Sequence, residues 1–122
     1  MSSIERPLKG DVLVFDLDEE RARVSDAEII GRSGRNARTL LKSGPLRVTL
    51  IVLGPGGGIP EHHAEGTMLV QPIVGRIEFT AGDKTHELEP GQLLSTGPGV
   101  PHAVRSEAGA TFLLTVQQPM SV

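Results

Sequence analysis

The feature of this sequence that most constrains its fold is a series of short runs of strand-forming residues, which fills the chain from Ala37 onward. Each run has five to eight residues and is separated from the next by residues that include Gly, Pro or Asp. The runs are ARTLLK, LRVTLIVL, TMLVQPIV, RIEFTA, KTHELE, QLLST, HAVRS and ATFLLTV. No helical segment lies between them, which disfavours a parallel α/β sheet. The pattern predicts an all-β domain, an antiparallel sandwich or barrel.

The residues between the runs supply the backbone angles that reverse a strand. Four of these turn signals are Gly44-Pro45, Ala81-Gly82-Asp83, Glu89-Pro90-Gly91 and Pro98-Gly99. The length of 122 residues is typical of one domain with one hydrophobic core. With no Trp, no Tyr and three Phe, that core must consist mainly of Val, Leu and Ile, which again favours strands.

We expect residues 37–122 to form the barrel and residues 1–36 to form an extension with one helix that packs on it. In the extension, the run VLVF at 12–15 predicts a short strand. Capping residues at Asp16 and Asp18 then predict a helix over 18–29, which the glycines that follow would end, namely Gly31 and Gly34.

Charge and composition exclude several classes of function. Fifteen acidic and twelve basic residues give a net charge of −3, and neither sign forms a block that would follow a phosphate backbone, so nucleic acid is disfavoured as a partner. The absence of cysteine excludes disulfides, thiolate metal sites and cysteine nucleophiles. Because no apolar leader or membrane-length segment is present, we expect a cytoplasmic location and no membrane partner.

Two segments carry closely spaced glycine, proline and histidine. The first is GGGIPEHHAEGTMLVQPIVGRIEF, with Gly56, His62 and Gly75, and the second is PGQLLSTGPGVPHAV, with Gly91, Pro98, Gly99, Pro101 and His102. Their spacing resembles the two motifs of the cupin family, and the second match is the stronger. The resemblance covers about half the chain, from Pro55 to Ser106. It implies a jelly-roll barrel, or double-stranded β-helix, with a functional site at its mouth.

In the cupin family, His and Glu side chains of these motifs hold a divalent metal, often iron, manganese, nickel or zinc. This chain departs from that pattern, because Ala64 stands where a second His belongs, Met68 stands at the Glu position and Ser106 replaces a frequent Asn. The resemblance therefore leaves His62 and His102 as metal ligands. Two imidazoles alone bind metal weakly, so another group would have to complete the site.

The candidates for that group depend on strand register. In an extended strand, His62 and Ala64 share one face, and Glu61, His63 and Glu65 share the other. The family alignment turns His62 inward, whereas a slip of one residue would turn the second set inward. His86, beside a turn, is expected to be an exposed strand residue, and the run GPGGGIP at 54–60 is expected to be a flexible connection between strands.

Gln71 is a further candidate, because it lies in an otherwise apolar run. An inward Gln71 would ligate a metal or orient a ligand. Simple alternation from Met68 places it on the opposite face, unless a bulge at Gly66 or Pro72 resets the alternation. The competing interpretation is a surface amide.

These observations support three hypotheses. The first is a small-molecule binding protein whose pocket includes His62, Met68, Gln71 and His102. The second is a metal-dependent enzyme in which His62 and His102, with Gln71 or a nearby Glu, hold a divalent ion. The third is an assembly protein without a ligand. A homodimer is compatible with all three, since apolar strands such as LRVTLIVL would bury both faces in a dimer.

Overall fold

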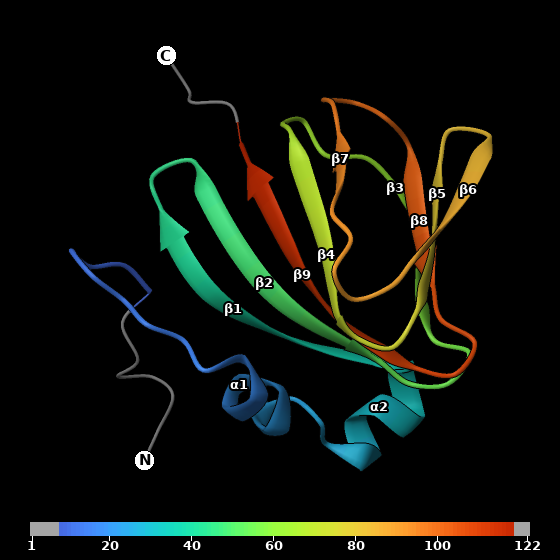
Figure 1. The fold of residues 1–122 in the computed structure, drawn as a ribbon, viewed down its shortest axis with the longest axis horizontal. Helices are drawn as coiled ribbons and strands as arrows, with labels where there is room; N and C mark the ends of the chain where they lie inside the picture. Colours follow the sequence, from blue (N-terminus) through green and yellow to red (C-terminus); the bar gives the residue numbers. More distant parts are fainter. Residues whose placement is uncertain (1–7, 119–122) are drawn as a thin grey trace.

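The structure, a computed structural model, describes residues 8–118 and is built mainly of strands (Figure 1). Two short helices precede the strands, α1 (Leu17–Arg23) and α2 (Ala27–Ser33). The strands are β1 (Arg35–Ser43), β2 (Leu46–Leu53), β3 (Gly58–His62), β4 (Met68–Val74), β5 (Ile77–Ala81), β6 (Lys84–Leu88), β7 (Leu94–Thr96), β8 (His102–Arg105) and β9 (Ala110–Gln117).

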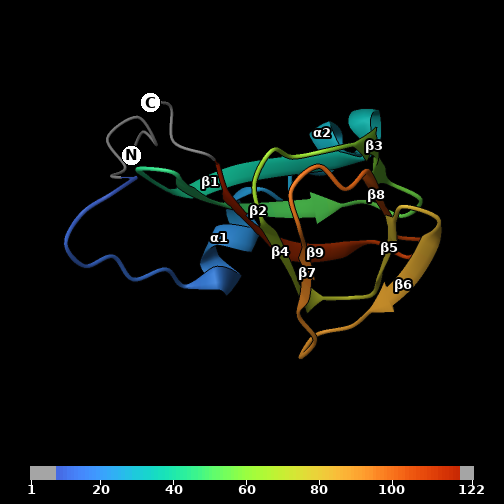
Figure 2. The same ribbon diagram turned by 90° about the horizontal axis from the view of Figure 1, so that it is seen from above.

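The strands form two antiparallel sheets that enclose a common interior (Figures 1 and 2). The larger sheet has the order β1-β2-β9-β4-β7 and the smaller has the order β3-β8-β5-β6. Apart from the β1–β2 and β5–β6 hairpins, successive strands lie in different sheets, so that the segment 54–57, for example, crosses from β2 to β3. This is the two-sheet antiparallel barrel that the sequence pattern predicts, and each of the eight predicted runs overlaps one of its strands.

The ninth strand, β3, was not among the predicted runs. It begins with Gly58 directly after two other glycines, and such a sequence is typical of a loop. A Cβ atom on Gly58 would collide with the carbonyl oxygen of Val104 and lie 3.2 Å from the Cα of Arg105. Glycine at this position therefore lets β3 pair closely with β8. The segment 54–60 is accordingly a connection only in its first part, since β3 begins at Gly58.

The strand β2 contributes to two separate cores. Ile51 and Leu53 face the barrel interior, where they join a cluster that includes Phe79 and Phe112. Leu50 and Val52 face outward and pack with Val24, Leu40 and partly buried residues of the helical segment. Both views place the helices on this outer side of the larger sheet (Figures 1 and 2). The apolar outer face of β2 is thus covered by the chain's own helices, and its sequence does not require a second subunit.

The N-terminal segment differs from the prediction in two ways. The run VLVF at 12–15 is not a strand, and the side chains of Val12 and Val14 are 82% and 90% exposed. The predicted single helix is two helices, because the Asp26 side chain accepts hydrogen bonds from the backbone of Glu28 and Ile29 and starts a new one. Asp16 caps α1 as predicted, and Gly34, at a φ of 81°, ends α2.

An ion pair fastens the first helix to the barrel. The Nε of Arg38, on β1, donates to Oε1 of Glu20, on α1, over 2.6 Å, and the two side chains are 12% and 11% exposed. This pair holds α1 against the outer face of the larger sheet. Within the described part of the chain, neither helix has the length and apolar character needed to cross a membrane.

Candidate functional site

Two histidines meet at one end of the barrel. His62 is the last residue of β3 and His102 is the first of β8, and they are direct cross-strand partners. Their Nε2 atoms lie 2.9 Å apart, and the ring centroids are 4.1 Å apart at an angle of 69°. A register shift between Ile59 and His62 produces this pairing. The structure thus brings together the two histidines that the sequence motifs singled out.

Both rings are oriented by backbone carbonyls. Nδ1 of His62 lies 2.9 Å from the carbonyl oxygen of Pro60, and Nδ1 of His102 lies 3.0 Å from that of Val100. Because a carbonyl only accepts hydrogen bonds, each Nδ1 carries a hydrogen and donates it. In two neutral rings, both Nε2 atoms would then present lone pairs to each other. A proton or a metal ion bound between the two Nε2 atoms would relieve this repulsion at their separation of 2.9 Å.

The two rings have different surroundings. His102 is 2% exposed, and its ring stacks on Phe79 with centroids 5.5 Å apart and an angle of 14° between the planes. Burial lowers the pKa of His102, the hydrogen bond to Val100 opposes this shift, and the nearby charges of His62 and His63 add to it. Burial therefore favours the neutral form of the His102 ring. His62 is exposed at the end of β3.

Gln71 does not join this pair, and its exposure fits the second of the two interpretations, a surface amide. Met68 and Val70 are 2% and 0% exposed and belong to the interior cluster, whereas Gln71 between Val70 and Pro72 is exposed. The bulge in β4 lies between Pro72 and Val74, beyond Gln71, and so cannot reset its direction. Gln71 is a surface amide on the outer face, where simple alternation places it.

The other predicted candidates are also solvent-exposed, namely Glu61, His63 and Glu65, and His86 is an exposed residue of β6, as expected. In the region 8–118, no group of three His, Asp or Glu side chains is arranged to hold a metal ion. Two metal–nitrogen bonds of about 2.05 Å at a right angle place their nitrogens about 2.9 Å apart, so the two Nε2 atoms match adjacent ligand positions. Since no described side chain supplies a third, the site does not fit a metal held by protein ligands alone.

The loops beside the histidines are held by glycines whose role was not evident from the sequence. The backbone N–H of Gly99 donates to the carbonyl of Ala64 over 2.8 Å, which ties the segments 97–101 and 63–67 together. Gly66 packs so closely on the end of β9 that a Cβ there would lie 2.6 Å from the carbonyl carbon of Gln117. Ser106, at the end of the second motif, is 1% exposed and donates from Oγ to the carbonyl of Arg76 over 2.7 Å. It therefore has a structural role.

Comparison with known proteins agrees with this architecture. The Cupin_2 family, described as a cupin domain, matches residues 49–116. A conserved Streptococcus pyogenes protein of unknown function is similar in structure, with a TM-score of 0.73, 24% identity and coverage of 94% of this chain and 95% of that chain. A Thermus thermophilus protein gives a TM-score of 0.71 and 24% identity, with coverage of 87% of this chain and 98% of that chain.

A third similar structure is larger than this chain. It is an oxalate decarboxylase variant from Bacillus subtilis, with a TM-score of 0.65 and 26% identity, and the match covers 70% of this chain and 26% of that chain. No protein with a curated description matches the sequence.

Proposed function

Because this chain belongs to the Cupin_2 family of cupin domains, we propose that it binds a small molecule at the mouth of its barrel, with His62 and His102 as the polar anchor. The observation that carries this proposal is the pair of Nε2 atoms, 2.9 Å apart, between two rings whose Nδ1 atoms are fixed by the backbone. His62 is exposed, so a ligand that enters the mouth can form a hydrogen bond with its imidazole.

The surroundings of the pair also favour a small ligand. Small-molecule sites are mostly apolar, with a few well-placed polar groups. Here Phe79, from the apolar interior, stacks on the ring of His102, and the two imidazoles supply fixed polar groups. One structure similar to this chain carries the name of an enzyme that acts on oxalate, which supports starting a ligand screen with molecules of that size.

A metal-dependent enzyme is the second candidate, and the Nε2 separation of 2.9 Å is the observation that favours it. His62 and His102 would hold a divalent iron, manganese, nickel or zinc ion, and water or the substrate would have to supply the remaining ligands. When bound, such an ion polarises a carbonyl or activates oxygen. The lack of a third ligand among the described side chains makes simple binding of a small molecule the better supported function.

Elemental analysis and ligand screening of untagged protein would distinguish the two candidates. For binding without metal, we expect less than about one tenth of an equivalent of metal after reconstitution, together with thermal stabilisation by a ligand that His62→Ala and His102→Ala abolish. His86→Ala is the matched control, because His86 is exposed on β6 away from the pair. Stoichiometric metal that disappears in His62→Ala would instead establish the metal site. Equal effects of all three substitutions would contradict the assignment of the pair.

We also propose that the protein is a homodimer. The support comes from Val12 and Val14, which present two apolar side chains to solvent. In the same N-terminal segment, the carbonyl of Leu8 accepts a hydrogen bond from the backbone N–H of Lys42, on the edge strand β1, over 2.8 Å. A monomeric mass by light scattering at micromolar concentration would contradict this proposal.

A further inference from the structure

The strand registers define which side chains line the mouth of the barrel. On the larger sheet, one row of cross-strand partners consists of Lys42, Arg47, Val116, Met68 and Thr96. On the smaller sheet, the matching row consists of His62, His102, Ala81 and Lys84. The segments 63–67 and 97–101 join the two sheets at this level, at the end drawn uppermost in Figure 1. We call these two sets of residues the mouth rows.

The side chains of the mouth rows point to the inside. Met68 belongs to the interior cluster, and Val116 and Ala81 pack against it. Direct cross-strand partners share a face of their sheet, so Arg47, the partner of Val116, shares the inner face. The pairing of β2 with β9 is continuous from Leu46 to Leu53, without a bulge. Alternation from the buried Ile51 and Leu53 therefore gives Arg47 the same direction.

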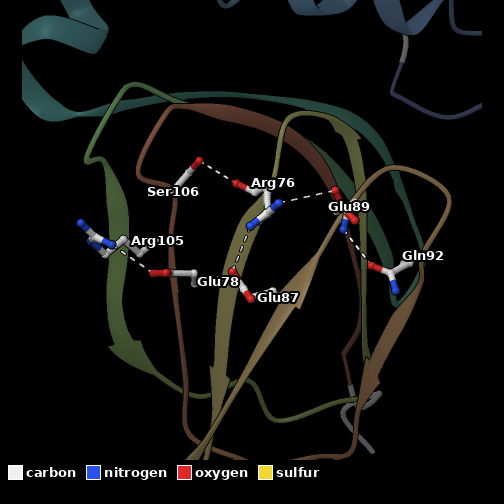
Figure 3. Close-up of polar contacts among 7 residues, drawn as sticks. All are labelled: Arg76, Glu78, Glu87, Glu89, Gln92, Arg105 and Ser106. Atoms are coloured by element: carbon white, nitrogen blue, oxygen red, sulfur yellow. Dashed lines mark hydrogen bonds and ion pairs between the residues drawn. The ribbon is translucent and has the colours of Figure 1, made fainter.

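The charges on the mouth rows have a single sign. Lys42, Arg47 and Lys84 are basic, and neither row contains a carboxylate. The protein as a whole carries a net charge of −3. Acidic residues gather instead on the outer face of the smaller sheet and just beyond it, where Glu78, Glu87 and Glu89 pair with Arg105 and Arg76 (Figure 3). A concave site lined by one sign of charge concentrates ligands of the opposite sign.

Arg47 is exposed and, within residues 8–118, forms no ion pair. Three carboxylates lie near this end of the barrel but outside the mouth rows, namely Glu61, which precedes His62 on β3, Glu65 in the segment 63–67 and Asp83 in the β5–β6 turn. A guanidinium presents a planar pair of donors that matches the two oxygens of a carboxylate or phosphate. Arg47 lies on the inner face of the larger sheet, which faces the smaller sheet and its two histidines.

We propose that the ligand of the barrel mouth is a small molecule with an oxyanion group, and that Arg47 is the residue that binds this group. The inference rests on the proposed function, since it names the chemical class of the same ligand. The histidine pair then binds a second polar group of the ligand, and the half-buried side chain of Val116 contacts the part between them.

An NMR titration of the full chain labelled with ¹⁵N tests this inference with simple probes in place of the natural ligand. The probes are malonate, succinate and inorganic phosphate, with malonamide and succinamide as uncharged counterparts of the two acids. We expect an acid or phosphate to shift and saturate the amide signals of the mouth rows, whereas the diamides do not. Arg47→Gln should weaken this binding about tenfold or more. Arg105→Gln, which removes an exposed arginine from the outer face of the smaller sheet, should change it less than about twofold.

The possible outcomes distinguish a failure of this inference from a failure of the proposed function. Diamides that bind as tightly as the acids, or an Arg47→Gln variant with unchanged melting temperature and affinity, would overturn the inference and leave the proposed function standing. If no probe, charged or uncharged, shifts the mouth rows, both fail together. Binding of phosphate without binding of either acid would support Arg47 and identify the oxyanion as a phosphate group.

Discussion

Replacement of Gly66 by Ala is expected to destabilise the protein, because it would separate the segment 63–67 from the last strand, β9. The new Cβ would collide with the carbonyl oxygen of Gln117 and lie 2.6 Å from its carbon, whereas Cβ atoms in proteins are essentially never found within 3.0 Å of such atoms. Both neighbours are backbone, so no side-chain rotation relieves the overlap. The segment 63–67 must move away from β9, which strains the hydrogen bond from the N–H of Gln117 to the carbonyl of Thr67, now 3.0 Å long.

The magnitude follows from these two effects. Overpacking costs about 1–3 kcal/mol and loss of a backbone hydrogen bond about 0.5–1.5 kcal/mol, so the free energy of unfolding should fall by about 2–4 kcal/mol. Urea denaturation measures this difference. Gly97→Ala is the matched control, because a Cβ at Gly97 meets nothing within 4 Å and the residue has no positive φ. Its effect should stay within about 0.5 kcal/mol. A Gly66→Ala variant as stable as the Gly97→Ala variant would refute the reasoning.

Four further predictions concern the helix contact, the site and its surroundings. Glu20→Gln should lower the free energy of unfolding by about 3 kcal/mol, because it leaves the nearly buried Arg38 without its carboxylate; a double substitution of both residues by Met should recover most of the loss in urea denaturation. Phe79→Ala should cost about 3–5 kcal/mol, since Phe79 is 0% exposed and supports the ring of His102, and no loss in a thermal melt would contradict that packing. In EDTA, stability should fall as the pH drops below 6.5, the ordinary pKa of His102. The folded chain lowers that pKa, so in that window the unfolded chain binds more protons; His102→Gln should flatten this dependence in melts between about pH 5 and 7. Gln71→Ala should leave ligand affinity within about twofold by calorimetry, because Gln71 is exposed on the outer face, and a tenfold loss would show that it reaches the site.

The strands were predictable because each apolar run is separated from the next by a turn residue, and local turn chemistry does not depend on distant contacts. The helical segment was less predictable. Asp26 offers a capping side chain within a sequence that otherwise continues a helix, and whether the helix restarts there depends on how Val24 packs against the barrel. The run VLVF has strand propensity, yet no strand pairs with it in the described structure.

For the site, the motifs located His62 and His102, and the register confirmed that they meet. What the sequence could not supply was the set of residues opposite them. Arg47 lies fifteen residues before His62 in the chain, and only the pairing of β2 with β9 and the stacking of two sheets place both at the mouth. Gln71 is the opposite case. It was a candidate because it is polar within an apolar run, but strand alternation places it on the outer face of the sheet, away from the site.

The position of β9 has a consequence for how the chain is made in the cell. This strand follows the other eight along the chain but lies between β2 and β4, near the middle of the larger sheet. Until it has left the ribosome, β2 and β4 each have an open edge, and the interior cluster lacks Phe112. Open apolar edges favour association with other chains. Nascent chains stalled before Ala110 should therefore depend on chaperones, and the barrel can close only after its final strand is synthesised.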